Sequence, residues 1–294
     1  MPAPILPDIR DTVHRFTLGA AQVSTVLDGV VRRDAVRPPF AMDLSDADLA
    51  AIGRAANLPH DRMEHGFVPV VVNTGAELVL FDTGFGPAGL ANGTGRLVEG
   101  LGRLGYAPGD IDVVAFTHAH PDHIQGVSTD GRSTFANARY VMGRTEFDCW
   151  SSGRQIPPQR AANRELFLTL IAPLADRFTF VEDGQPVAPG ITAEAAFGHS
   201  PGHMMYRVES AGRQLLIWGD VTNHYVYSLR HPDSPVAFDD LPDAAIATRR
   251  RVLAMAADDG LMVAGFHMPF PSVGHVERRG DSFIWVPATY QLRV

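Results

Sequence analysis

The chain has 294 residues, of which 45% are hydrophobic and 20% are charged, so it can bury a large core and is not disordered. Its 25 basic and 33 acidic residues give a net charge of −8, which phosphate backbones and anionic lipid would repel, and this argues against nucleic acid and membrane surfaces as partners. Every basic residue is an arginine, which excludes mechanisms that need a lysine amine, such as Schiff bases and the Walker A phosphate clamp.

The single cysteine, Cys149, cannot form an internal disulfide or a cysteine-based zinc cage. No apolar run approaches the roughly 18 residues that span a bilayer. Residues 1–8 lack the basic and apolar regions of a secretory signal. We therefore expect a cytoplasmic protein, with an exported form whose leader has been removed as the open alternative.

The sequence predicts one domain over 1–294, in which residues 1–65 form an extension of strand plus helix packed on the rest. Apolar residues over 16–28 predict β-structure. The segment Ser45-Asp-Ala-Asp48 is typical of a helix N-cap with an acidic first turn, and it predicts a short helix to about Ala56.

The middle of the chain continues with strands and a helix. Residues 67–73 and 77–82 predict the two strands of a hairpin, joined at Thr74-Gly75-Ala76. Leucines at helical spacing predict a helix over 96–105. Residues 111–117 are almost continuously apolar, as in a strand that is buried on both faces.

The second half repeats this alternation of strands and helices. Helices are predicted over 160–174 and from Pro242, a residue favoured at the first helical position, to about 257. Strands are predicted at 191–196, 204–209, 214–218, 261–265 and 283–287. This order fits an α/β (α+β) fold built as a four-layer αββα sandwich, with a doubly wound parallel sheet as the alternative.

Three histidines follow the 111–117 run in the segment Thr117-His118-Ala-His120-Pro-Asp122-His123. Residues two apart at a strand end point the same way, so His118 and His120 can share one ion. The proline then breaks the strand and directs Asp122 and His123 elsewhere. Four ligand-type side chains within six residues therefore predict two adjacent metal centres.

Three further ligand candidates each come directly after an apolar run, and they are His199, Asp220 and His267. An acid or imidazole in such a place is costly to bury unless it is paired or bound to metal. Each alone is as compatible with a hydrogen-bonded core residue as with a ligand. Together with the histidine cluster they favour completed coordination spheres.

From residue 70 onward the sequence resembles the metallo-β-lactamase superfamily, and within it the methyl parathion hydrolase-like branch, which also holds lactonases and aryl esterases. The matching segments are 72–75, 81–84, 117–123, 198–203 and 266–275. The resemblance implies a first metal on His118, His120 and His199. It implies a second on Asp122, His123 and His267, with Asp220 bridging the two.

The resemblance also implies a homodimer and two residues that support the ligands, Asp82 and His203. For Asp82 a turn-forming role is an equally good interpretation. Aromatic residues near the motifs are candidates for a substrate pocket, with core packing as the alternative for each. These residues are Phe85, Trp150, Tyr225, Tyr227 and Phe270.

Imidazole and carboxylate donors without thiolate favour Zn²⁺, with Mn²⁺, Co²⁺ and Fe²⁺ as alternatives. Two such ions would share a hydroxide that attacks a carbonyl or phosphoryl centre, and Asp122 or Asp220 would relay a proton. We therefore expect a hydrolase of small esters, with lactones of the acyl-homoserine type or aryl esters first and organophosphate triesters second. A di-iron redox member of the superfamily is the alternative of another class.

Two look-alike motifs carry less weight. Gly198-His-Ser200-Pro-Gly202 matches a serine-hydrolase elbow, but Pro201 lacks the N–H that the oxyanion hole needs. Gly84-Phe-Gly86-Pro-Ala-Gly89 matches a dinucleotide motif, but the following strand ends in histidine rather than an acid; we interpret it as a mobile turn. The triplet Arg249-Arg250-Arg251 is interpreted as a solvated helix face.

Overall fold

Two seven-stranded sheets dominate the protein, which we describe from a computed structural model of residues 5, 8–288 and 291–294. In spatial order the first sheet consists of β1 (Val13–Leu18), β2 (Ala21–Val26), β5 (Val70–Asn73), β6 (Leu78–Phe81), β7 (Val113–Ala115), β10 (Arg139–Gly143) and β11 (Phe178–Val181). The second consists of β12 (Pro186–Ala188), β13 (Ile191–Ala195), β14 (Met204–Ser210), β15 (Arg213–Ile217), β16 (Met262–Ala264), β17 (Val273–Arg279) and β18 (Ser282–Pro287).

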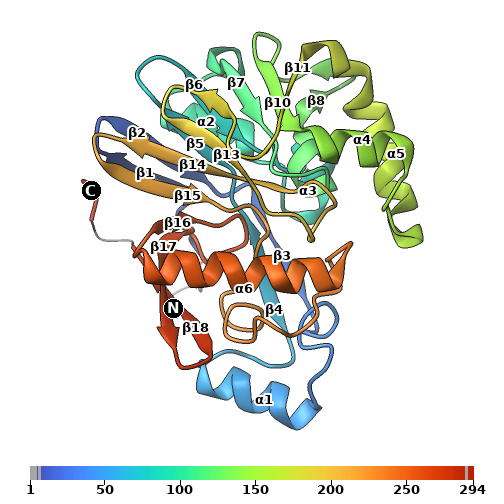
Figure 1. Ribbon diagram of the computed structural model, residues 1–294, viewed down its shortest axis with the longest axis vertical. Helices are drawn as coiled ribbons and strands as arrows, with labels where there is room; N and C mark the ends of the chain where they lie inside the picture. Colours follow the sequence, from blue (N-terminus) through green and yellow to red (C-terminus); the bar gives the residue numbers. More distant parts are fainter. Residues whose placement is uncertain (1–4, 6–7, 289–290) are drawn as a thin grey trace.

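Smaller elements complete the described part of the chain (Figure 1). Two short antiparallel pairs are β3 (Gly29–Arg33) with β4 (Met63–Phe67), and β8 (Ser128–Thr129) with β9 (Arg132–Ser133). The α-helices are α1 (Asp46–Ala55), α2 (Leu97–Leu104), α3 (Pro121–Ile124), α4 (Arg144–Ser152), α5 (Ala161–Leu170) and α6 (Pro242–Asp258). Short 3₁₀-helices span Gly86–Asn92, Pro108–Asp110, Gln125–Val127, Pro158–Arg160 and Ala172–Arg177.

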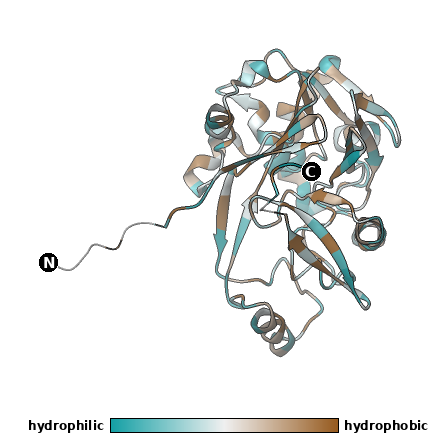
Figure 2. Cartoon of the chain, turned by 90° about the vertical axis from the view of Figure 1, so that its left-hand side faces the viewer, coloured by the Kyte–Doolittle hydropathy of each residue, from teal (hydrophilic) through white to brown (hydrophobic). Residues whose placement is uncertain are grey.

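Three apolar layers hold the sheets and helices together. Buried residues such as Phe81 and Tyr206 fill the space between the two sheets. The outer face of the first sheet packs against α2, α4 and α5 through residues such as Leu101 and Trp150. The outer face of the second packs against α6 through Val252, and α6 is seen end-on beside the sheets in the turned view of Figure 2. The predicted αββα sandwich is therefore confirmed.

The doubly wound alternative is wrong, because antiparallel pairs form much of both sheets. In the first sheet only β6, β7, β10 and β11 run parallel, and in the second only β15 and β16 do. The strands β1 and β2 belong to the first sheet itself. How many domains the chain forms stays a prediction.

Some predicted elements differ from those in the structure. The region 16–28 contains a reversal at Gly19, whose φ of +58° and contact with Ser210 exclude a side chain there. The predicted helix over 160–174 ends at Leu170, because Pro173 has no N–H to continue the helical ladder. The helix start at Ser45 is confirmed, since its side chain accepts the Asp48 N–H at 3.1 Å.

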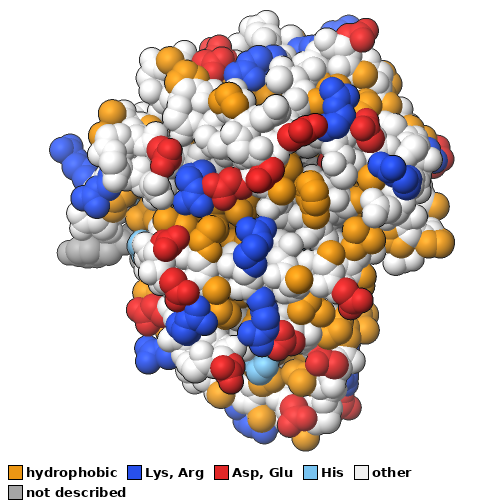
Figure 3. Space-filling view, in the orientation of Figure 1, with side chains coloured by type: hydrophobic (Ala, Val, Ile, Leu, Met, Phe, Trp, Pro, Cys, Tyr) orange, Lys and Arg blue, Asp and Glu red, His pale blue; other side chains and the backbone are white. Residues whose placement is uncertain are grey.

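Acidic and basic side chains are interspersed on the face shown in Figure 3, and neither sign gathers into one patch there. Within the described residues, no helix has both the length and the apolar character needed to cross a bilayer.

Candidate metal centre

The ligand candidates lie in the segments that follow four strands. His118, His120, Asp122 and His123 follow β7, and α3 begins at Pro121 between them. His199 follows β13, Asp220 follows β15 and His267 follows β16. All seven residues come together, and all are buried except Asp122, which is partly buried.

The seven residues form two groups whose ligand atoms lie within 4.8 Å of one another in each group. Cluster one is His118, His120 and His199, and cluster two is Asp122, His123, Asp220 and His267. Asp220 also reaches cluster one, because its Oδ2 lies 3.2 Å from His199 Nε2 and 3.0 Å from His267 Nε2. The grouping matches the one that the resemblance implies, while coordination of metal by these residues stays a prediction.

The imidazoles of cluster one turn lone pairs toward one another. His120 Nδ1 lies 3.0 Å from His118 Nε2 and 2.9 Å from His199 Nε2. The outer nitrogens of His120 and His199 face the carboxylates of Asp240 (3.0 Å) and Asp239 (2.9 Å), which accept their protons. A neutral imidazole has only one N–H, and here the outer nitrogen carries it. The inner nitrogens therefore point bare lone pairs at one another, and a cation bound between them would accept those lone pairs.

Asp82 contacts the imidazole of His123 directly and that of His118 through Thr117. This buried residue has a φ of +61°, and its carboxylate accepts the Thr117 N–H (2.8 Å), the Thr117 hydroxyl (2.9 Å) and His123 Nδ1 (2.8 Å). The Thr117 oxygen can then accept from His118 Nδ1 at 3.0 Å. His118 and His123 therefore both turn Nε2 inward.

Cluster two contains buried polar atoms with no hydrogen-bond partner among the described residues. They are His123 Nε2 and Asp220 Oδ1, which lie 3.5 Å apart. Burial disfavours a charged imidazole, but the carboxylates of Asp82, Asp122 and Asp220 raise the pKa of His123 well above its ordinary value. The surrounding carboxylates therefore favour positive charge at this cluster, and its nitrogen and oxygen donors fit a divalent cation.

Two histidines beside the clusters have different partners. His203 accepts the Asp220 N–H at Nε2 (3.1 Å) and donates from Nδ1 to the Ala196 carbonyl (3.0 Å), so it orients Asp220. His65, which the sequence did not single out, lies 2.8 Å from His267 Nδ1. That nitrogen is also 2.9 Å from the carbonyl of Gly66.

Glu146 joins the two loops that carry cluster one. Its fully buried carboxylate accepts the Ala119 N–H (2.8 Å), the Ser200 hydroxyl (2.6 Å) and the Gly202 N–H (2.7 Å). Ala119 lies between two ligand candidates, and Ser200 follows a third. Nothing in the local sequence around Glu146 indicates this contact, since the residue lies on α4, an element that the sequence did not predict.

The pH dependence of stability tests the burial of Glu146. Burial outweighs its hydrogen bonds and raises the pKa of Glu146 from 4.5 to about 7. The folded chain then holds a proton that the unfolded chain has lost, so the free energy of unfolding falls as pH rises from about 4.5 to about 7 and is flat above. Between pH 4.5 and 7 we expect the free energy of unfolding of the wild type to fall by about 3 kcal/mol more than that of Glu146→Gln, at 1.4 kcal/mol per pKa unit.

Urea unfolding of both proteins from pH 4.5 to 8, with EDTA present so that cation loss does not contribute, measures this difference. Parallel stability profiles for wild type and Glu146→Gln would contradict the expectation.

The structure agrees with the rejection of the serine-hydrolase and dinucleotide motifs, and it corrects the interpretation of the arginine triplet. Ser200 is buried in the core, where it donates to Glu146 and accepts from Trp150 Nε1 (3.0 Å), so it is not an exposed nucleophile. The 84–89 turn is bound by the buried Asp28, whose carboxylate accepts the Phe85 N–H (3.2 Å) and would repel a phosphate. Arg249 is fully buried rather than solvated.

The predicted pocket aromatics fall in different places. Trp150 is buried behind His120, with ring centres 5.7 Å apart, and Phe85 packs on Phe67 at 4.9 Å. Tyr225 and Phe270 line a cavity of about 530 Å³ that reaches His267. That cavity is also lined by His65, Asn223 and His224.

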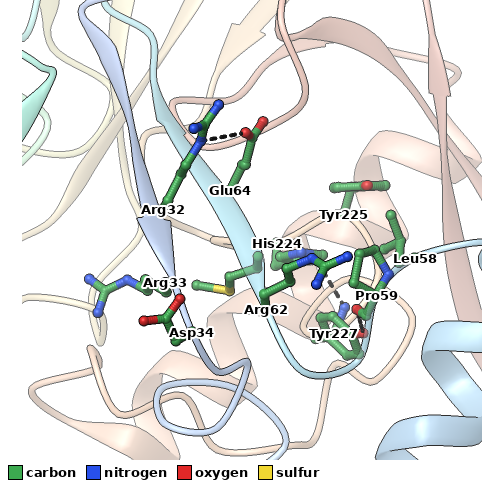
Figure 4. A pocket seen from close by; sticks show the side chains of 11 residues that line it. Arg32, Arg33, Asp34, Leu58, Pro59, Arg62, Glu64, His224, Tyr225 and Tyr227 are labelled. Carbon is green, nitrogen blue, oxygen red and sulfur yellow. Dashed lines mark hydrogen bonds and ion pairs between the residues drawn. The ribbon is translucent and has the colours of Figure 1, made fainter.

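A second cavity of about 550 Å³ shares the lining residues Glu64, His224 and Tyr225 with the first. Its apolar wall includes Leu58, Pro59 and Tyr227, and Figure 4 shows Arg62 reaching across it toward His224. The His224 ring is fixed, since its Nδ1 accepts the N–H groups of Val226 (3.0 Å) and Tyr227 (3.2 Å).

An αββα sandwich with paired histidine–aspartate clusters in the loops after its strands defines a class of metal-binding protein. A family model described as the metallo-beta-lactamase superfamily matches residues 68–267, and the chain belongs to that superfamily.

Similar proteins agree with this assignment. N-acyl homoserine lactonase AiiA of Bacillus thuringiensis subsp. kurstaki is 26% identical over 199 residues, which are 63% of this chain and 70% of the relative. The solved structure of hydrolase AbOPH is 25% identical and has a TM-score of 0.88, over 97% of this chain and 100% of that one. AidC, described as a dizinc quorum-quenching lactonase, has a TM-score of 0.89 at 23% identity over 95% and 98%.

Proposed function

We propose that this protein is a hydrolase that holds two divalent cations on clusters one and two and opens lactones, with N-acyl homoserine lactones as substrates. The observation that carries the proposal is the convergence of seven donors into two adjacent clusters joined by Asp220. The similarity to N-acyl homoserine lactonases supports the choice of substrate.

The number and type of the metal-binding atoms in the two clusters suit hydrolysis by two divalent cations. His118, His120 and His199 offer three nitrogens, and cluster two adds two nitrogens and two carboxylates. Nitrogen and oxygen donors without thiolate favour Zn²⁺. When bound, such a pair of cations supplies an activated water and polarises the carbonyl that it attacks.

The chain's own residues orient the donors and receive the substrate. Asp82, Asp239 and Asp240 hold outer imidazole nitrogens, so the inner lone pairs stay directed at the clusters. The exposed edge of Asp122 makes it the carboxylate best placed to exchange a proton with solvent. The cavity that reaches His267 would take the acyl group, between Tyr225 and Phe270.

A substrate panel with metal analysis of the same sample tests the proposal. We expect hexanoyl homoserine lactone to be hydrolysed with a kcat/KM at least about tenfold above those of phenyl acetate and of paraoxon, a difference of about 1.4 kcal/mol in the transition state. We also expect two zinc ions per chain and loss of turnover on chelation.

Other results of that panel point to other functions. Faster hydrolysis of the triester would favour an organophosphate hydrolase, and iron with a visible absorption band would favour a redox protein. A homodimer stays a separate prediction, which sedimentation of the loaded protein measures.

A further inference from the structure

Two consecutive buried carboxylates lie behind cluster one, just before α6. Asp240 Oδ2 is 3.0 Å from His120 Nε2, and Asp239 Oδ1 is 2.9 Å from His199 Nδ1. The Asp240 N–H also donates to the His199 carbonyl at 3.0 Å. A single dipeptide therefore contacts the outer nitrogens of two of the three imidazoles in cluster one.

An arginine stands behind each carboxylate. Arg160 Nε donates to Asp240 Oδ1 at 2.7 Å, and Arg249 Nη2 donates to Asp239 Oδ2 at 2.7 Å. Arg249 and Asp239 have fully buried side chains, and Arg160 is largely buried. Because a guanidinium can only donate, the oxygen that faces it must accept, and each carboxylate is held in a fixed orientation.

The second oxygen of each carboxylate is then also an acceptor, so the histidine that faces it must donate. We propose that Asp239 and Asp240, held by Arg249 and Arg160, fix the proton of His199 and His120 on the outer nitrogen and so set the cation affinity of cluster one. The proposal rests on the proposed metal centre. Asp239, Asp240, Arg160 and Arg249 are positioning residues, since none of these four belongs to either cluster.

The other three histidines of the two clusters hydrogen-bond to different partners. The proton of His118 is directed to Thr117, that of His123 to Asp82 and that of His267 to Gly66. A change at Asp240 should therefore weaken cluster one and leave cluster two as it is.

Asp240→Asn tests the proposal, because Arg160 dictates how the new amide lies. The amide oxygen must face Arg160, so the NH₂ group faces His120 Nε2 and drives the proton to Nδ1, the nitrogen inside the cluster. We expect the affinity of the first cation to fall about 10–100-fold, the usual effect of losing such a partner. Zinc titration of the full chain against a chromophoric chelator measures both binding steps.

Nitrogen NMR of the cation-free protein reads the proton directly. We expect His120 to carry its proton on Nε2 in wild type and on Nδ1 in Asp240→Asn. Damage to packing alone would not move the proton.

A second substitution should reverse the effect. In Arg160→Met with Asp240→Asn the amide is free to turn and offer its oxygen to His120, so affinity should return to within about threefold of wild type, which is less than about 1 kcal/mol. Arg160→Met alone keeps the carboxylate as an acceptor but no longer fixes its orientation, so it should weaken the first cation by less than Asp240→Asn does. Asp233→Asn, which removes an exposed carboxylate paired with Arg250, is the matched control and should change nothing.

Loss confined to the first cation, with rescue by the double variant, supports the proposal. Unchanged binding in Asp240→Asn, equal weakening of both cations, or absence of rescue would overturn it. Should wild type itself bind no cation, the proposed function fails, and that result is distinct from a failure of this inference.

Discussion

Asp220→Asn is expected to lose both bound cations and to lower kcat/KM for the lactone by about 10³-fold or more, because the activated water depends on the pair of ions. Asp220 is the residue that reaches both clusters, through His199 at 3.2 Å and His267 at 3.0 Å. An asparagine keeps the size but removes a negative charge and one anionic donor. Its neighbours His203 and Asn223, which hold the loop and the carboxylate, stay in place.

Metal content after dialysis and kcat/KM on the same sample measure the effect, and circular dichroism checks the fold. Asp233→Asn is again the matched control, since that carboxylate is 61% exposed, and it should keep two cations and full turnover. If Asp220→Asn kept two cations and wild-type turnover, Asp220 would not be the shared donor.

Arg249→Met is expected to lower the free energy of unfolding by about 3–5 kcal/mol, because it leaves the buried carboxylate of Asp239 without its counter-charge. The guanidinium also donates to the carbonyls of Val221 (3.2 Å), Pro232 (3.0 Å) and Ser234 (3.2 Å). Arg249 thereby ties the segment that follows Asp220 to α6. The substitution should therefore loosen most strongly the segment after Asp220 and its contact with α6, next to the clusters.

The neighbouring residue provides the control. Arg250→Met removes an exposed ion pair with Asp233, which is worth less than about 1 kcal/mol. Urea unfolding of the two variants and wild type measures the contrast. Equal losses from both substitutions would mean that the burial of Arg249 contributes nothing.

The cluster residues could be predicted because their positions are marked locally. His118, His120, Asp122 and His123 directly follow a buried strand, and His199, Asp220 and His267 each follow another apolar run. Polar groups at the end of a buried strand are unusual without a partner or a metal. The alternation of strands and helices also predicted the layers, because each element must bury its apolar face.

Other residues that contact the cluster side chains from behind have no such local signal in the sequence. Asp239 and Asp240 precede a helix, where acids are common for reasons that have nothing to do with metal. Arg249 stands in a run of three arginines, and only the packing of α6 decides that this one is buried while Arg250 is exposed. His65 meets His267 across 202 positions of sequence.

The sequence by itself indicated the seven residues of the two clusters, their order along the chain and the layered fold, since strand ends and apolar periodicity are local features. Only the tertiary structure decided which further side chains hold the cluster residues from behind, namely Asp239, Asp240 and Glu146. The physical reason is that a hydrogen bond between distant segments depends on where the folded backbone places its two atoms. The local spacing of residues along the chain does not determine those positions.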